Sequence, residues 1–285
     1  MQPIEVDKQY HFFNPRAGVS YTLAERNNFY LSFAVAQKEP TRSDFTDRYK
    51  FAADDTYPSS EKLYDWELGY QYTAPRLSLG VNLYYMKYKD QLVPTGMVND
   101  DSNALNTNVP DSYRRGVELS ASWRATGWFT VGANATFSQN RIENYVDALK
   151  DSPTYGKELG DMTIAYSPDV IANAFLNFHH RGFEAVFHTQ HVGKQYFTNN
   201  ENDALSLDAY CVTNLNLAYT FRTRSARSVR LGLLINNLFN AEYESNGYGY
   251  SYMDTWSGPA PVRIDEAYYF PQAPLNVLAN VTVKF

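Results

Sequence analysis

The chain of 285 residues is long enough for one large domain or two ordinary ones. It contains no run of about 18 consecutive apolar residues, the length that a membrane-spanning helix needs, so the sequence argues against helical spans. The net charge of −6 argues against nucleic acid as a partner, because such binding depends on clustered lysine and arginine. The single cysteine, Cys211, excludes an intrachain disulfide.

Aromatic residues are unusually frequent, at 16% of the chain, with 24 tyrosines and 17 phenylalanines. Outer-membrane barrels concentrate aromatic side chains in two girdles at the level of the lipid headgroups. A tyrosine-rich soluble β protein would have a similar composition. The order of the residues must therefore distinguish the two.

The first eight residues contain neither a basic stretch nor an apolar stretch, and so do not form a signal peptide. A barrel of the outer membrane has to be exported. We therefore expect the chain to be the later part of a longer protein.

Alternation of apolar and polar residues, the pattern of a strand with one apolar and one polar face, recurs along the whole chain. Most segments are close to the length of about ten residues that a membrane-spanning β-strand needs. We count about eleven such segments, at residues 12–23, 29–38, 63–73, 77–86, 116–123, 129–138, 170–178, 183–192, 211–221, 229–235 and 275–285.

Short and long connections follow one another in turn. The short ones are residues 24–28, 74–76, 125–127, 179–182 and 222–227. The long ones are residues 39–60, 93–112 and 141–168, followed by two further loops before residues 211 and 275. Tight periplasmic turns and long extracellular loops are typical of an outer-membrane barrel, whereas a soluble sandwich gives no reason for the alternation to persist.

The last segment shows the two faces most clearly. Val281, Val283 and Phe285 lie on the apolar side, with Thr282 and Lys284 between them. The corresponding second face of the other segments is rich in Gly, Ser, Asn and Thr, which suits a wet or plugged lumen. Trp123 and Trp128 bracket a short turn, where a periplasmic girdle is expected. The sequence thus predicts an all-β, antiparallel, transmembrane outer-membrane β-barrel.

Several motifs, taken together and in this order, resemble the TonB-dependent outer-membrane receptors, in the style of their Bacteroidetes members. The most specific is INNLFNAEY at residues 235–243, similar to the motif of the family's penultimate strand. The others are KEPTRSDF at 38–45, EKLYDWELGY at 61–70, RGVEL at 115–119, VGKQY at 192–196 and YFPQAP at 269–274.

The resemblance implies a barrel of about 22 strands, of which residues 1–285 would form the C-terminal half. It also implies an N-terminal plug domain inside the barrel and a short TonB box ahead of it, and neither is recognisable in this sequence. We expect the chain alone neither to engage the TonB complex nor to transport, because that engagement runs through the missing part.

Charged side chains on the polar face are candidates for contact with the plug, and simple hydration is an equal alternative. By the parity of their positions they are Asp65, Glu67, Arg114, Glu118 and Glu184.

The candidate ligand site is the segment 242–270, where aromatic residues alternate with turn-forming ones. Such a surface can adapt to a planar or amphipathic ligand such as a metal chelate. The alternative is an upper aromatic girdle with loop self-packing. Arg263 could pair with an anionic ligand, although Asp265 and Glu266 lie close enough to neutralise it. The candidates are Tyr248, Tyr250, Tyr252, Trp256, Arg263, Tyr268 and Tyr269.

Other chemistry finds little support in the sequence. His188 and His191 are three apart in a strand, so their rings point to opposite faces and do not form a chelating pair. The pairs Asp54–Asp55 and Asp100–Asp101 fall in long loops, where they would be solvated or would contact cations or lipopolysaccharide. No GxSxG nucleophile motif occurs. We expect no catalytic site, no resident metal and no cofactor.

The expected function is energy-coupled uptake of a scarce nutrient across the outer membrane of a Gram-negative bacterium. The resemblance implies an iron–siderophore or similar chelate as cargo, with haem, cobalamin or a glycan as alternatives. Outer-membrane lipid and lipopolysaccharide would surround the protein. Two other classes remain open: a passive porin or translocator, and a complete barrel enzyme of about twelve strands.

Overall fold

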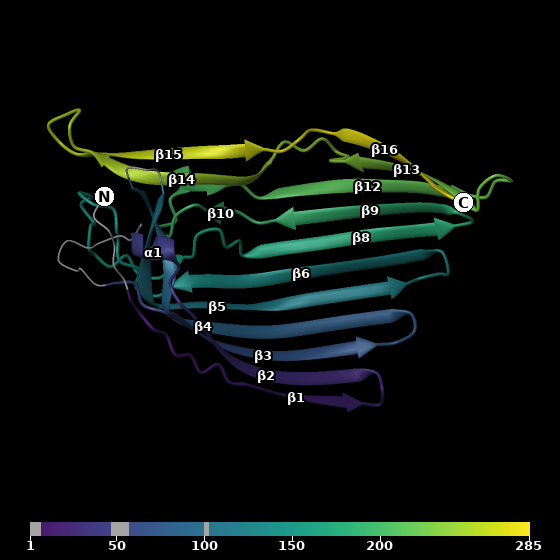
Figure 1. Ribbon diagram of the computed structural model, residues 1–285, viewed down its shortest axis with the longest axis horizontal. Coiled ribbons are helices and arrows are strands. Elements are labelled where there is room, and N and C mark those ends of the chain that lie inside the picture. Colours follow the sequence, from purple (N-terminus) through teal and green to yellow (C-terminus); the bar gives the residue numbers. More distant parts are fainter. Residues whose placement is uncertain (1–6, 47–56, 100–102) are drawn as a thin grey trace.

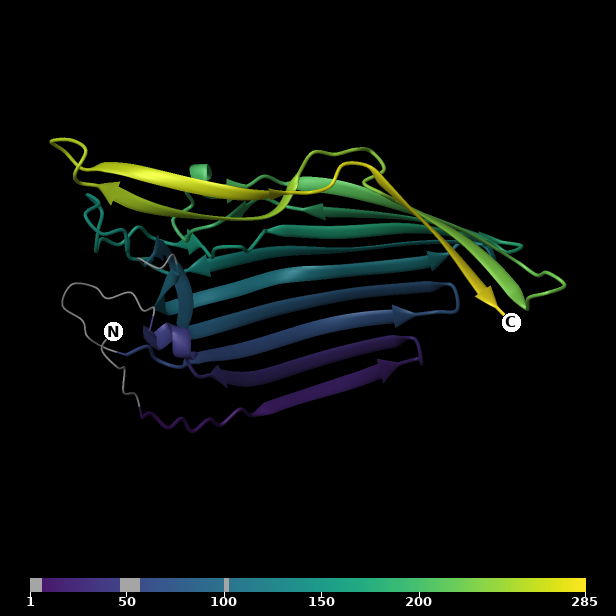
Figure 2. The ribbon, with the colours of Figure 1, turned by 45° about the horizontal axis from the view of Figure 1, so that its top comes forward.

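The structure is a computed structural model that describes residues 7–46, 57–99 and 103–285. It consists of one large, twisted, antiparallel sheet whose strands lie side by side in chain order, together with loops and one hairpin at one end (Figures 1 and 2). The sheet is not closed, because β1 and β16 form its two edges. The predicted all-β fold of about eleven strands is confirmed. None of the helices among the described residues is long and apolar enough to cross a membrane.

The path through the sheet includes eleven strands. They are β1 (Arg16–Leu23), β2 (Asn27–Lys38), β3 (Glu61–Thr73), β4 (Leu77–Val98), β5 (Ala104–Arg124), β6 (Phe129–Ile142), β8 (Val170–His180), β9 (Phe183–Val192), β12 (Tyr210–Phe221), β13 (Ser228–Asn236) and β16 (Asn276–Lys284).

The remaining elements are short or separate. The short strand β7 (Met162–Thr163) pairs with β6, and β10 (Gln195–Tyr196) pairs with β11 (Ser206–Leu207). A separate hairpin is formed by β14 (Glu244–Asp254) and β15 (Val262–Pro271), and the helices are α1 (Arg42–Thr46) and the 3-10 turn η1 (Asp203–Leu205).

The two ends of the sheet differ in the way the sequence predicts. The tight turns β1–β2, β3–β4, β5–β6, β8–β9 and β12–β13 all lie at one end, where the C-terminus also lies (Figure 1). The longer connections, with α1, β10, β11 and the β14–β15 hairpin, gather at the opposite end. We call these the short-turn end and the loop end.

The register gives the sheet one apolar and one polar face. Leu31, Leu68 and Leu83 lie opposite one another on β2, β3 and β4, and all three are about half exposed. One residue further along, Tyr30, Gly69 and Asn82 form the corresponding row on the polar face. Exposed apolar side chains in a folded protein call for an apolar surrounding such as lipid. Val281, Val283 and Phe285 are likewise exposed at the end of the chain.

Aromatic side chains form two bands on the apolar face. The lower band, at the short-turn end, includes the stack of Trp128 on Phe178, at 6.1 Å between ring centroids, and the exposed Trp123. The upper band includes Phe33, Trp66 and Tyr85, whose neighbouring rings are 5.1 and 5.8 Å apart.

The distance between the bands matches a membrane. Leu77 of β4 pairs with Trp123, and Lys87 of β4 pairs with Tyr64 and Tyr113 of the upper band. The ten residues between them rise about 33 Å along the strand. At a tilt of about 40° this is about 25 Å along the membrane normal, the height of the apolar band of an outer-membrane barrel.

The largest fully buried side chains lie in or next to the loops rather than in the body of the sheet. They are Phe197, Ile142, Leu205, Asn199, Thr198 and Ser112. One apolar cluster is built from Val93, Val109, Ile142, Tyr145 and Ile164, and a second from Phe197, Leu205 and Leu207.

Two segments expected to be loops are largely strand. Residues 93–98 and 104–112 form the extended ends of β4 and β5, where Val93 pairs with Thr107 and Val109 with Gln91, and both valines are buried in the first apolar cluster. Residues 242–270 form most of the β14–β15 hairpin. In both cases the long connection continues as paired strands beyond the membrane-spanning part of the sheet.

The backbone conformation of the β8–β9 turn can be tested at Gly182. Its φ is +87°, and a Cβ added there would lie 2.3 Å from the backbone oxygen of Thr220. We expect Gly182→Ala to lower the free energy of unfolding by about 1–3 kcal/mol, because both the backbone conformation and the close approach exclude a side chain. The measurement is the midpoint of urea denaturation in detergent micelles, followed by circular dichroism.

The matched control is Gly127→Ala in the β5–β6 turn, where a new Cβ would meet no atom within 4 Å. We expect this change to leave the midpoint unchanged or to raise it slightly. Equal losses in the two variants would contradict the geometric explanation.

Candidate functional site

The five charged residues predicted for the lumen share the polar face of the sheet. The register places Asp65 and Arg114 on either side of Met86, and Glu67 opposite Tyr84. Two residues along β4 from Tyr84, on the same face, Asn82 lies opposite Glu118 of β5 and is hydrogen-bonded to it at 3.2 Å. Nearer the short-turn end, Glu184 accepts two hydrogen bonds of 2.8 Å from the guanidinium of Arg230. Their contact with a plug domain stays a prediction.

Arg114 connects the polar face to a loop. Its guanidinium donates to Ser167 Oγ at 2.9 Å and to Asn140 Oδ1 at 3.3 Å. Between the sheet and this loop lies a hollow of about 320 Å³, lined by Glu67, Glu118 and Tyr166 among others. The long loops therefore fold onto the polar face, which is the face expected to line the lumen.

The extended ends of β4 and β5 continue this layer of loops over the polar face at the loop end. They bend away from the wall, and the end of β4 contacts β14 of the hairpin (Figures 1 and 2). The bend occurs at Asp90, which has a φ of +54° and is skipped in the pairing of Lys89 with Asp111 and Gln91 with Val109.

Asn199 links three of these segments and is fully buried. Its Nδ2 donates to the carbonyl oxygen of Pro94 at 2.6 Å, and its Oδ1 accepts from the backbone N–H of Ala165 at 2.7 Å. Without Asn199 both backbone groups would lose this partner, which is costly for a group that is buried, as Ala165 is.

A carboxylate provides a second link. Glu201 accepts hydrogen bonds from the backbone and the hydroxyl of Thr163 and forms an ion pair with Arg141. Burial alone would raise the pKa of Glu201, but the hydrogen bonds from Thr163 and the charge of Arg141 outweigh it and lower that pKa. Glu201 is therefore ionised at neutral pH and holds β7 against the loop that follows β10.

The β14–β15 hairpin has two different faces. Its inner face, defined by Gly247, Gly249, Ser251, Arg263, Asp265 and Tyr269, packs against the loop of residues 197–205. Side chains at Gly247 and Gly249 would collide with Phe197, at 2.7 and 2.9 Å from the added Cβ, and so the two glycines permit the close approach. The ring of Tyr269 lies 5.8 Å from that of Phe197.

The outer face of the hairpin points away from these loops and carries a row of aromatic rings. It is defined by Tyr248, Tyr250, Tyr252, Glu266, Tyr268 and Phe270. Tyr248 and Tyr268 stack at 4.9 Å, and Tyr252 stacks at 6.4 Å on Trp256 in the connection between the strands.

Glu266 binds this row together. Its carboxylate accepts hydrogen bonds from the hydroxyls of Tyr250 at 2.7 Å, Tyr268 at 2.8 Å and Tyr252 at 3.2 Å. The bonds from Tyr250 and Tyr268 lower the pKa of Glu266, because they stabilise the carboxylate. They raise the pKa of the Tyr250 hydroxyl for the same reason.

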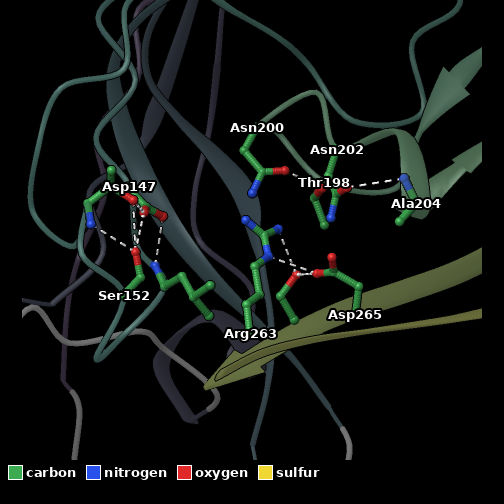
Figure 3. Close-up of polar contacts among 11 residues, drawn as sticks. Asp147, Ser152, Thr198, Asn200, Asn202, Ala204, Arg263 and Asp265 are labelled. Carbon is green, nitrogen blue, oxygen red and sulfur yellow. Dashed lines mark hydrogen bonds and ion pairs between the residues drawn. The ribbon is translucent and has the colours of Figure 1, made fainter. Parts of the chain in front are cut away.

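Arg263 is held by its own hairpin. Its Nε donates to Asp265 Oδ1 at 2.9 Å, and its terminal nitrogen donates to Ser251 Oγ at 3.1 Å (Figure 3). Burial opposes ionisation of Asp265, but the hydrogen bonds from Ser251 and Arg263 and the charge of Arg263 lower its pKa. Of the two carboxylates expected to neutralise Arg263, Asp265 does so, while Glu266 lies on the other face.

The predicted ligand residues therefore do not share one surface. Arg263 and Tyr269 lie on the inner face, next to the loop that carries Thr198, Asn200 and Asn202 (Figure 3). The tyrosines at 248, 250, 252 and 268 lie on the outer face, and Trp256 lies at the tip. Their role in ligand binding stays a prediction.

Sequence reasoning missed the residues that position the loops, chiefly Asn199, Glu201 and Arg141. No local pattern marks them, since each binds a partner at least 34 residues away. The histidines lie as expected: His188 pairs with Phe175 and His191 with Ala172, three positions apart and so on opposite faces. The carboxylate pairs at residues 54–55 and 100–101 lie outside the described residues.

Comparison with known proteins gives a consistent result. The model of the family "TonB dependent receptor-like, beta-barrel" matches residues 4–238. The structure is similar to the ferric yersiniabactin uptake receptor FyuA of Yersinia pestis, with 19% identity and a TM-score of 0.65 over 95% of this chain and 37% of the receptor.

Two further solved structures are similar at this level. They are the siderophore receptor PiuA of Acinetobacter baumannii (14% identity, TM-score 0.66, 93% of this chain and 35% of that chain) and the copper transporter OprC (18% identity, TM-score 0.67, 93% and 39%). The chain thus spans less than two fifths of the length of each. At these identities the similarity establishes the fold.

The buried link at Asn199 can be tested by Asn199→Ala. We expect the loops to open locally, because the change leaves the N–H of Ala165 and the carbonyl of Pro94 without partners, at a cost of about 2–4 kcal/mol. Hydrogen exchange of the peptide containing residues 163–167 should become at least about tenfold faster. Asn200→Ala, which removes only an acceptor for Thr198 Oγ1, is the control and should change exchange little. Unchanged exchange in Asn199→Ala would refute the link.

The outer face should respond to acid. Because the folded-state pKa of Glu266 is lowered, its contribution to stability is present above the ordinary pKa of glutamate, about 4.3, and is lost as the pH falls through the lowered value. We expect tyrosine near-ultraviolet circular dichroism and Trp256 fluorescence to change in that range. Glu266→Gln cannot ionise and should remove the transition. A transition that persists in this variant would have another origin.

Proposed function

The chain belongs to the family of TonB-dependent receptor-like β-barrels, and on that premise we propose that it forms part of the wall of an outer-membrane receptor for energy-coupled nutrient uptake. The cargo we propose is an iron–siderophore or a similar metal chelate. Binding, followed by release when a plug is moved, would be the whole chemistry, and no bond would be made or broken.

The observation that carries this proposal is the loop end. Polar links at Asn199, Glu201 and Arg114 hold the long loops over the polar face of the wall, and the hairpin packs on top of them. A construction of this kind suits a protein that closes over a cargo at the mouth of a lumen. The names of the similar solved structures, two of which are receptors for iron chelates or siderophores and one a copper transporter, support a metal chelate.

We propose further that this chain is the C-terminal portion of a larger barrel. The edges of β1 and β16 carry backbone N–H and C=O groups that no other strand of the described sheet binds. Such edges are not tolerated in lipid, because each unsatisfied group costs several kcal/mol there. Further strands, paired to both edges, would close the barrel, and a plug domain and a TonB contact would belong to that further part.

For the cargo contact we propose the inner face of the hairpin. Arg263 and Tyr269 are both accessible there and lie next to the loops over the polar face. Asp265 and Ser251 orient Arg263 through Nε and one terminal nitrogen, and its other terminal nitrogen would be the donor to an anionic chelate. Tyr248, Tyr250, Tyr252, Tyr268 and Trp256 would then stiffen the hairpin, and lipopolysaccharide would be their neighbour outside the barrel.

The test is uptake of ⁵⁵Fe-labelled chelates by the organism that encodes the chain. We expect disruption of the coding sequence to abolish uptake of one chelate class, and an uncoupler of the proton-motive force to do the same in the intact strain. Complementation should restore uptake, and complementation with Arg263→Ala should restore it poorly. Uptake that is insensitive to the uncoupler would favour a passive porin, and unchanged uptake of every ⁵⁵Fe-labelled chelate would refute the proposed cargo.

A further inference from the structure

Positive charge is concentrated at the short-turn end. Of the 25 lysines and arginines in the chain, eight lie in the five tight turns and the strand ends that flank them. Only one of the 31 acidic residues, Glu25, lies there. The remainder of the chain is therefore strongly acidic. The eight residues, which we call the basic rim, are Arg26, Arg76, Arg124, Arg181, Arg222, Arg224, Arg227 and Lys284.

The positive charges of the basic rim are available to a partner outside the chain. All eight side chains are exposed, and none forms an ion pair within the described residues. Arg230, a little deeper in the sheet, differs in this respect, because Glu184 neutralises it. An uncompensated row of cations along one edge of a protein repels itself, and an anionic surface would relieve that repulsion.

The basic rim lies directly beyond the lower aromatic band. Arg124 follows Trp123, and Arg222 follows Phe221 at the end of β12. In the neighbouring turn Arg181 precedes Phe183, whose side chain is exposed on the apolar face. Aromatic side chains at strand ends mark the headgroup level of a bilayer. The arginines are therefore placed where lipid phosphates lie.

We propose that the basic rim binds anionic phospholipid headgroups in the leaflet on the short-turn side. Guanidinium groups form bidentate hydrogen bonds with phosphate, which favours arginine over lysine in this role. Seven of the eight residues are arginine. The rim would also set the depth of the wall in the membrane and its orientation.

An acidic protein segment is the other class of anionic partner, and the arrangement of the charges favours lipid. The basic side chains are distributed over all five turns and the end of β16, so that each strand pair contributes at least one. A protein segment would contact a local cluster, whereas a leaflet surrounds the whole rim. The inference depends on the wall spanning a membrane but not on the proposed uptake, which would stand if the rim bound no lipid.

The four tryptophans provide the experiment, because Trp123 and Trp128 lie next to the rim, while Trp66 lies in the upper band and Trp256 at the hairpin tip. In the W66F/W256F chain Trp123 and Trp128 are the only tryptophans left, and their emission is followed with excitation that the tyrosines do not absorb. The purified protein in neutral detergent micelles is titrated with brominated phosphatidylglycerol or brominated phosphatidylcholine. We expect quenching by phosphatidylglycerol at about tenfold lower lipid concentration at low salt, and we expect the preference to shrink at high salt.

Charge variants locate the effect. R222Q/R224Q/R227Q and, separately, R76Q/R124Q/R181Q should each reduce the preference, and the two sets together should abolish it. The control K150Q/K157Q removes two exposed positive charges from the connection between β6 and β7, at the loop end, and should leave the preference unchanged.

The outcomes that overturn the proposal are equally specific. Equal quenching by the two lipids in the W66F/W256F chain would overturn it without any charge variant, so that a variant that fails to fold does not decide the matter. An equal loss in the loop-end control would show that net charge, not the rim, is responsible. Salt-sensitive binding of a polyglutamate peptide without a lipid preference would assign the rim to an acidic protein partner instead.

Discussion

Backbone hydrogen bonding within the sheet is the constraint on which the rest of this structure depends. In lipid no water is available to an unpaired N–H or C=O group, so a strand can cross only if both neighbours bind it. Each strand from β2 to β13 along the sheet has such neighbours on both sides, and the two that do not, β1 and β16, form the open edges. Because the wall is one strand thick, every residue lies on one of its two surfaces.

A wall of this kind has no core of its own. Its apolar side chains, such as Leu31 and Leu68, stay about half exposed and gain their stabilisation from lipid rather than from one another. Among the described residues, the apolar clusters of buried side chains lie where the chain leaves the membrane, around Ile142 and Phe197. The loop end therefore resembles a small soluble domain placed on a membrane-spanning sheet. Specific polar links such as that of Asn199 can form there without a large free-energy cost, because water can reach the margins of this end.

The same division, between the membrane-spanning sheet and the loop end, decides how far the sequence predicts the structure. Period-two alternation located all eleven strands of the wall and the face of each, because a side chain's face is set by local parity alone. The candidate lumen residues, Asp65 to Glu184, share one face for this reason.

Beyond the membrane that rule no longer suffices. The segment 93–112 reads as a polar loop, yet its few apolar residues find partners in a cluster that includes Ile142 and Ile164, far along the chain. The segment 242–270 was recognised by its aromatic content, but its division into an inner and an outer face depends on pairing register and on where Phe197 lies. Neither can be obtained from local pattern, because the contacts that decide them are long-range.

The distribution of charge over the fold cannot be obtained from the composition. A net charge of −6 describes an acidic protein, and it was enough to argue against nucleic acid. The fold separates that sum into a basic short-turn end and an acidic loop end, because every tight turn falls on one side of the sheet. Electrostatic forces in solution decay over about 10 Å at ordinary salt, much less than the height of this wall. Each end is therefore expected to interact with its surroundings according to its own charge, and the net value governs neither.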